Sequence, residues 1–354
     1  MLYLTFILCF LCSILITPFV KKLAFKIGAT DQPNQRKVHH KVMPRLGGLA
    51  IFISFLLGIL ILQPESPYDA AHPAIVAGGF IILVTGILDD IFDLSARVKF
   101  LLQIVAALVV VFWGGVDVEF INLPFNGRID FGIFTIPITV LWIVGVTNAI
   151  NLIDGLDGLA AGVSSIALIT ITGMAVVMGN AYVVAMGIVL IASTVGFLKY
   201  NFYPAKIFMG DSGALFLGYM ISVLALLGFK NIAVISFVVP ILILGVPISD
   251  TLFAIIRRLY NKNPLSAPDK SHLHHCILKL GYSHRETVLL IYAMSAMFGL
   301  AAVIFTMTTV WGSIIFITIL LLAIEIFVEN IGLINKNYRP LLRIMGMIKT
   351  ERNR

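Results

Sequence analysis

Long apolar runs alternate with polar segments along almost the whole chain. A membrane-spanning helix needs about 20 mostly apolar residues, since each residue advances the helix by about 1.5 Å. We assign eleven runs to spans, namely residues 2–20, 46–63, 74–88, 98–113, 133–150, 159–178, 182–198, 214–229, 232–256, 286–308 and 313–330. The pattern predicts an all-α polytopic membrane protein of about 11 transmembrane helices, with residues 1–354 forming one integral membrane domain.

Lysine and arginine are distributed very unevenly between the polar segments. When alternate segments are assigned to opposite sides, 23 of the 25 basic residues share one side, and only Arg128 and Lys230 lie on the other. Cytoplasmic loops carry the excess of basic residues in membrane proteins. The sequence therefore predicts an N-terminus outside and a C-terminus in the cytoplasm. Lys21 and Lys22 follow the first run and no basic residue precedes it, so a cleaved signal peptide is not expected.

The longest predicted outer loop covers residues 114–132. Its apolar residues Val116, Val118 and Phe120 alternate with polar ones before an Asn126–Gly127 pair, which favours a tight turn. The loop is therefore predicted to form a small extracytoplasmic β-hairpin.

Composition excludes the soluble classes of protein. Hydrophobic residues make up 59% of the chain and charged residues 12%, about half the charged fraction of a soluble domain. The net charge of +7 is explained by the cytoplasmic loops, so no nucleic-acid partner is expected. Three cysteines argue against a disulfide framework.

Acidic residues gather at the predicted cytoplasmic ends of the spans. Three separate loops carry them, as Asp89, Asp90, Asp93, Asp154, Asp157 and Asp211. Two unit charges about 4 Å apart interact by roughly 4 kcal/mol at an effective dielectric of 20, so clustered carboxylates repel unless a cation lies among them. Oxygen ligands suit Mg²⁺ or Mn²⁺. The acids therefore predict a metal cluster, whereas ordinary solvated loop acids would explain one loop better than three.

Two glycine-rich segments accompany these acids. Polar residues recur every three positions from Asn148 through Asn151 to Asp154, which indicates one polar stripe at a helix end. Helix packing through Asn and Gly is the alternative. The segment ending at residues 210–213 precedes a helix, where backbone N–H groups favour an anion, so it is a candidate phosphate site.

Two cytoplasmic loops are rich in histidine and basic residues. The segment 271–275 reads Ser-His-Leu-His-His, and phosphate contact or proton handling is favoured over structural zinc because no pattern completes four ligands. A solvated polar loop is the alternative. The first loop contains a run that could hold anionic lipid or substrate phosphates, formed by Arg36, Lys37, His39, His40, Lys41 and Arg45. Metal-holding acids and bases at a membrane face suit phosphoryl transfer with a lipid reactant.

Four motifs resemble those of the polyprenyl-phosphate N-acetylhexosamine-1-phosphate transferases, the MraY/WecA/TagO family. They are DDxxD at Asp89–Asp93, NxxNxxDGxDG at Asn148–Gly158, FMGDSG at Phe208–Gly213 and HLHH at His272–His275. The resemblance extends over nearly the whole chain, including the loop order. MPRLGG at Met43–Gly48 and SHLHH are similar to the WecA/TagO branch, and most similar to its TagO members, which begin wall teichoic acid synthesis.

The resemblance implies that undecaprenyl phosphate and UDP-N-acetylglucosamine (UDP-GlcNAc) give undecaprenyl-diphospho-GlcNAc and UMP at the cytoplasmic face of a bacterial plasma membrane. It implies a Mg²⁺ cofactor, with Mn²⁺ left open, and membrane lipid as a partner; a homodimer is also left open. The implied catalytic residues are Asp89, Asp90 and Asp211, with Asp211 and Asp90 as metal ligands. The implied substrate-binding residues are Lys99, Asn148, Asn151, Asp154, Asp157, Asn201, Phe208, His272, His274 and His275.

Several alternatives stay open at this point. Transfer can be a single displacement or proceed through an aspartyl intermediate, and the ionised lipid phosphate favours the first. An MraY-type donor, UDP-MurNAc-pentapeptide, would use the same metal site. An ion-coupled transporter would need acids near the membrane midplane, for which only Asp250, Glu325 and Glu329 are candidates. Asp250 either contacts substrate or pairs with Arg257 or Arg258.

Overall fold

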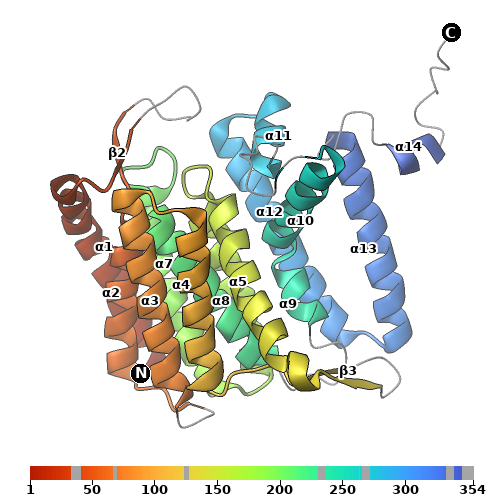
Figure 1. The fold of residues 1–354 in the computed structure, drawn as a ribbon, viewed down its shortest axis with the longest axis horizontal. Helices are drawn as coiled ribbons and strands as arrows, with labels where there is room; N and C mark the ends of the chain where they lie inside the picture. Colours follow the sequence, from red (N-terminus) through yellow and green to blue (C-terminus); the bar gives the residue numbers. More distant parts are fainter. Residues whose placement is uncertain are drawn as a thin grey trace.

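The structure is a computed structural model that describes residues 1–32, 41–66, 70–122, 127–229, 237–262, 264, 272–331 and 339–344. It is predominantly helical. The helices are α1 (Leu2–Ile27), α2 (Gly47–Leu62), α3 (Ala71–Phe92), α4 (Ala96–Phe112), α5 (Thr135–Ile153), α6 (Leu159–Val177), α7 (Ala181–Asn201), α8 (Gly210–Phe229), α9 (Val238–Ile243), α10 (Gly245–Tyr260), α11 (Leu273–Lys279), α12 (His284–Met307), α13 (Val310–Ile331) and α14 (Pro340–Ile344). They form a bundle in which most helices lie side by side (Figure 1).

Eight helices of the described chain are long and apolar enough to cross a membrane. They are α1, α3, α5 with its preceding 3₁₀ turn (Gly132–Phe134), α6, α7, α8, α12 and most of α13. The predicted spans 46–63 and 98–113 correspond to the shorter helices α2 and α4, of 16 and 17 residues. The chain is thus a multi-pass membrane protein with eight candidate spans among its described residues, and the number of about 11 stays a prediction.

The predicted span 232–256 is not one continuous helix. Among its described residues α9 ends at Ile243 and α10 begins at Gly245, with Leu244 between them. Pro247 lies four residues after Ile243, and a proline ring clashes with the carbonyl group four residues before it. The apolar run is therefore broken into two helices.

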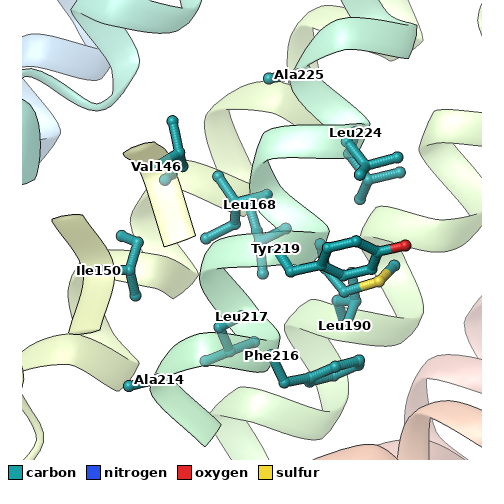
Figure 2. Close-up of a cluster of buried hydrophobic side chains, with 14 of the residues drawn as sticks. Val146, Ile150, Leu168, Leu190, Ala214, Phe216, Leu217, Tyr219, Leu224 and Ala225 are labelled. Atoms are coloured by element: carbon teal, nitrogen blue, oxygen red, sulfur yellow. The ribbon is translucent and has the colours of Figure 1, made fainter. Parts of the chain in front are cut away.

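Helix α8 forms the centre of the bundle and is buried along almost its whole length. Figure 2 shows its side chains Phe216, Leu217 and Tyr219 lying against residues of α5, α6 and α7. Tyr219 is fully buried, and its hydroxyl donates to the carbonyl of Ile75 in α3 at 3.0 Å. Because other helices enclose α8 on all sides, it is a rigid support for the residues at its ends.

Two small antiparallel sheets lie at opposite ends of the bundle. Strands β1 (Thr30–Asp31) and β2 (Met43–Pro44) pair near the ends of α1 and α7, whereas β3 (Phe120–Asn122) pairs with β4 (Arg128–Asp130) at the other end (Figure 1). The β3–β4 pair lies where the hairpin was predicted, although Asn126 of its predicted turn is outside the described residues. The N-terminus lies at the end opposite β2 and α11 (Figure 1).

Candidate active site

Two aspartates from distant segments share one lysine at the end of the bundle that carries β2. The Lys99 Nζ donates to Asp89 Oδ2 and to Asp211 Oδ2, each at 3.1 Å. Asp89 lies in the last turn of α3, Lys99 in the first turn of α4 and Asp211 in the first turn of α8. The structure therefore brings together three residues that the sequence predicted as functional.

Asp90 has a different set of contacts from its neighbour Asp89. Its Oδ1 accepts the backbone N–H of Asp211 at 2.9 Å, and its Oδ2 accepts that of Ser212 at 3.1 Å. The Asp90 side chain is fully buried. It therefore occupies the start of α8, where the sequence predicted a phosphate site, and satisfies two N–H groups that this helix cannot satisfy itself.

A glycine is required where Asp90 meets α8. Gly210 has φ +73°, and an added Cβ would lie 2.4 Å from Asp90 Oδ2. Gly86 and Gly48 permit similarly close approach, because a Cβ on either would lie within 2.3 Å of the backbone of Ser212 or Gly213. The glycines thus allow α2 and α3 to pack directly on the start of α8.

Arg45 is a second cation among the carboxylates. Its Nε donates to Asp90 Oδ1 at 3.3 Å, and its Nη1 donates to Asp31 Oδ1 at 3.4 Å and lies 3.8 Å from Asp93 Oδ1. The sequence placed Arg45 only in a general basic run. In the structure, Arg45 and Lys99 supply the cationic charge that the clustered acids require.

The described residues contain no group of three or more His, Cys, Asp or Glu side chains placed to hold a metal ion by themselves. One carboxylate oxygen near Lys99 nevertheless has unused bonding capacity. Asp89 Oδ1 is buried and has no hydrogen-bond partner. An unpaired buried carboxylate oxygen is costly, which indicates a site that is completed by a bound group.

A cavity of about 570 Å³ opens beside these residues. A volume of this size is within the usual range for small-ligand sites, roughly 300–1,000 Å³. Seven of the sequence-predicted site residues line it, namely Asp154, Asp157, Asn201, Phe208, Asp211, His274 and His275. Asp89, Asp90, Lys99, Asn148, Asn151 and His272 are not among its lining residues. Arg45, Tyr203 and His284 also line it.

Backbone pairing brings Phe208 to the cavity. The Phe208 N–H donates to the Pro44 carbonyl at 2.9 Å, and its own carbonyl accepts the N–H of Gly47 at 3.1 Å. The segment before α8 therefore lies alongside β2. Asn201, at the end of α7, steadies the same segment by donating to the Ile207 carbonyl at 3.0 Å, while its buried Oδ1 has no partner.

Asp154 follows the end of α5 and is half-buried at the cavity. Burial and the nearby charges of Asp211 and Asp90 raise its pKa to about 8. Its carboxyl group is therefore mostly protonated at pH 7 in the free protein. It can then donate a hydrogen bond instead of adding to the negative charge.

Neither of the two polar residues before Asp154 lines the cavity, and Asn148 joins α5 to α4. Asn148 donates to Gln103 Oε1 of α4 at 2.5 Å and to the Val144 carbonyl at 2.8 Å. Asn151 is half-buried one turn later. The Asn148–Gln103 pair joins α5 to α4 one helical turn after Lys99. In this structure Asn148 therefore has the helix-packing role that the sequence left open as the alternative.

His272 is engaged by Asp250. The Asp250 Oδ2 lies 2.9 Å from His272 Nδ1, and Oδ1 accepts the N–H of Leu273 at 2.8 Å. Both side chains are buried. Asp250 thus caps the start of α11 and orients the histidine segment.

His274 packs against the Asp154–Gly155 segment. A Cβ on Gly155 would lie 2.4 Å from His274 Nε2, and the rings of His274 and His275 are 4.2 Å apart. Burial, followed by the charge of His275, lowers the pKa of His274 to about 3. His274 is therefore neutral throughout the physiological range and cannot act there as a cation toward phosphate.

We expect this burial to make stability depend on pH. Unfolded histidine titrates near 6.5, so below that pH the unfolded chain binds a proton that folded His274 does not. Stability should fall as the pH decreases from 6.5, with His274 accounting for about 2 kcal/mol at pH 5. The loss of melting temperature in detergent between pH 7 and 5 should be smaller in His274→Gln. The same loss in both proteins would contradict this.

Residues 72–229 match the family model described as glycosyl transferase family 4. The chain is 52% identical over 337 residues to the "Probable undecaprenyl-phosphate N-acetylglucosaminyl 1-phosphate transferase" of Bacillus subtilis (strain 168), covering 95% of this chain and 93% of that one. It is 37% identical to the decaprenyl-phosphate N-acetylglucosaminephosphotransferase of Mycolicibacterium smegmatis, covering 82% and 79%. It is 33% identical to the undecaprenyl-phosphate alpha-N-acetylglucosaminyl 1-phosphate transferase of Thermotoga maritima, covering 82% and 85%.

These similarities span the segments that carry Asp89, Asp90, Lys99 and Asp211, which the structure brings together. Because the relative that is 52% identical covers nearly all of both chains, this chain belongs to glycosyl transferase family 4.

Proposed function

We propose that the chain transfers GlcNAc-1-phosphate from UDP-GlcNAc to undecaprenyl phosphate and releases UMP. The observation that carries the proposal is the Asp89–Lys99–Asp211 arrangement beside a cavity large enough for a nucleotide sugar. The names of the relatives support the same donor and lipid classes. We also propose that the site faces the cytoplasm of a bacterial plasma membrane and that the product feeds wall teichoic acid synthesis, on the basis of the loop charges and the family resemblance.

We propose that Mg²⁺ is held by Asp211 and Asp89, in place of the pair Asp211 and Asp90 that the family resemblance implies. Mg²⁺ usually takes one or two protein carboxylates, with water and substrate phosphates supplying the other ligands, so three protein ligands are not required. The unpartnered Asp89 Oδ1 fits this arrangement, whereas both oxygens of Asp90 already accept hydrogen bonds. When bound, the ion would neutralise phosphate charge and stabilise the leaving group.

The protein's own residues have distinct tasks in the proposed reaction. Lys99 and Arg45 offset the negative charge of the reactants, and the Phe208 ring offers a flat surface for the uracil. An oxygen of the lipid phosphate attacks the sugar-linked phosphorus, and the bond from that phosphorus to the bridging oxygen breaks. The bridging oxygen leaves with its electron pair as part of UMP. Because the lipid phosphate is already ionised, this single displacement needs no strong base.

The transporter alternative loses two of its three candidate acids. Asp250 binds His272 and the start of α11, and Glu329 is fully buried with both oxygens accepting backbone N–H groups of α14, from Leu341 and Leu342, at 2.8 Å. These two acids therefore complete helix ends rather than line an ion path.

The direct test uses purified protein, undecaprenyl phosphate and UDP-GlcNAc labelled in the sugar. Label should enter the lipid with an equal amount of UMP released, and chelation of divalent metal should stop the transfer. Mg²⁺ and Mn²⁺ are added back separately to identify the cofactor. Transfer only from UDP-MurNAc-pentapeptide would replace the donor, and no transfer from either donor by folded protein would refute the proposal.

Asp89→Asn separates the proposed metal-holding role from covalent catalysis. An asparagine ligand holds Mg²⁺ more weakly, so the Mg²⁺ concentration for half-maximal activity should rise about 10- to 100-fold. Saturating Mg²⁺ should restore most of the turnover. Loss of turnover that no Mg²⁺ concentration restores would instead indicate an aspartyl nucleophile.

A further inference from the structure

The backbone of Asp157 is held by a histidine that the proposed reaction does not use. His284 is the first residue of α12, and its Nε2 accepts the Asp157 N–H at 3.0 Å. The Asp157 side chain then accepts the N–H of Ala205 through Oδ2 at 2.9 Å. These two hydrogen bonds join α12, the α5–α6 connection and the α7–α8 connection on one side of the cavity. We call this side, formed by Asp157, Ala205 and His284, the Asp157 wall.

An aromatic stack covers the same histidine. The Tyr203 and His284 rings are 4.6 Å apart, with 29° between their planes. Both residues line the cavity, and Tyr203 is 46% exposed. The imidazole is therefore held between its hydrogen bond to Asp157 and the tyrosine ring.

Helix α12 makes a second contact with this wall. The Tyr292 hydroxyl, two turns after His284, donates to the Gly158 carbonyl at 2.5 Å. A Cβ on Gly162 would overlap the Tyr292 ring, so α12 and α6 are in very close contact. Because α12 is already fixed by this packing, the ring of His284 has a rigid base from which to hold Asp157.

The acidic end of the cavity is supported by other contacts. Asp211 and its neighbours are held by Asp90, Lys99 and the pairing of the Phe208 segment with β2, and none of these bonds involves α12. Loss of the His284 bond should therefore loosen the Asp157 wall without moving the acids. A change at His284 should therefore alter the affinity for the donor without altering the rate of the phosphoryl transfer step.

We infer that His284 is a positioning residue that fixes the Asp157 wall and thereby sets the affinity for the nucleotide-sugar donor. Its Nε2 must carry no proton in order to accept the Asp157 N–H, so the neutral ring with the proton on Nδ1 is the state that performs this task. The inference rests on the proposed function, because it assigns the cavity to that donor.

The test compares His284→Leu with His284→Gln, since the glutamine carbonyl oxygen can accept the same N–H. His284→Leu should raise KM for UDP-GlcNAc about tenfold while kcat stays within about twofold. The Kd of UDP, measured by calorimetry, should rise by a similar factor. His284→Gln should stay within about threefold of the wild type in both quantities.

His72→Gln is the matched control. His72 is also half-buried and bonds a side chain, with its Nδ1 3.1 Å from the Tyr182 hydroxyl, but it lies at the other end of α3 from the acids. KM and Kd should not change in this variant. If His284→Leu does not fold, Tyr203→Leu replaces it, and loss of the ring stack should raise KM about threefold.

Three results would overturn the inference while leaving the proposed function intact. In the first, KM and Kd equal the wild-type values in the His284 variants or, where it is needed, in Tyr203→Leu. In the second, kcat falls while KM is unchanged. In the third, Gln and Leu reduce activity equally, together with the melting temperature. A wild-type protein that neither binds UDP nor transfers sugar phosphate would instead refute the proposed function, and the inference with it.

Discussion

Asp211→Asn is expected to lower the rate of sugar-phosphate transfer by about three orders of magnitude while leaving the protein folded. The Asp211 carboxylate contacts Lys99 at 3.1 Å and lies at the cavity, where we propose that it holds the metal. Asparagine removes the negative charge of the proposed main ligand, since Asp211 lines the cavity whereas Asp89 does not. The start of α8 should survive the change, because the Asp211 backbone rather than its side chain binds Asp90.

Asp93→Asn is the matched control for this substitution. It makes the same chemical change at the same end of the bundle. The Asp93 side chain, however, is 89% exposed, and its Oδ1 lies 3.8 Å from Arg45 Nη1, a distance too long for a hydrogen bond. An exposed pair of this kind contributes about 0–1 kcal/mol, so activity should stay near that of the wild type. The measurement is initial rate at saturating donor, lipid and Mg²⁺, beside the melting temperature. More than about a tenth of wild-type activity in Asp211→Asn would exclude Asp211 as the main ligand.

Asp90→Ala is expected to have the largest effect on stability. It leaves the N–H groups of Asp211 and Ser212 and the Arg45 guanidinium without a buried partner. Breaking a buried charge pair costs about 3–5 kcal/mol, which should lower the melting temperature in detergent by about 5–10 °C. Activity should fall as well, because Asp90 positions the helix that carries Asp211.

Asp90→Asn should be intermediate, since its carbonyl oxygen can still accept one of the two N–H groups. The Asp90 variants should lose both stability and activity, whereas Asp211→Asn should lose activity alone. This difference separates the structural role of Asp90 from the proposed catalytic role of Asp211. Asp93→Asn again serves as the control. A melting temperature of Asp90→Ala within about 2 °C of the wild type would show that α8 does not depend on this cap.

Sequence alone predicted that the protein is a multi-pass helical one. It also predicted that the acids lie at helix ends on one side of the bundle. Crossing the hydrocarbon core takes about 20 mostly apolar residues, whether they face lipid or other helices, so a run of residues identifies a span without knowledge of its neighbours. The ninth predicted span shows the limit of this approach. Its composition is that of a single span, but Pro247 breaks the hydrogen-bond ladder, and the helix ends at Ile243.

The assignment of tasks within the motifs required the structure. His272 and His274 belong to one short motif, yet Asp250 binds the first, while the second packs on Gly155. Asn148 is a predicted substrate-binding residue that bonds Gln103 of α4 and does not line the cavity. The site residues that prediction missed, His284 and Tyr203, belong to no motif and could not be distinguished from ordinary polar residues at a helix end.

The sequence by itself determined that the chain crosses the membrane several times and which residue types collect at one end. The tertiary structure alone decided which of two adjacent aspartates faces Lys99 and which caps α8. Successive residues of a helix point about 100° apart, so Asp89 and Asp90 meet different neighbours. Those neighbours are distant in the chain, since Asp90 and Asp211 are 121 residues apart. A contact over that separation exists only after the helices have packed.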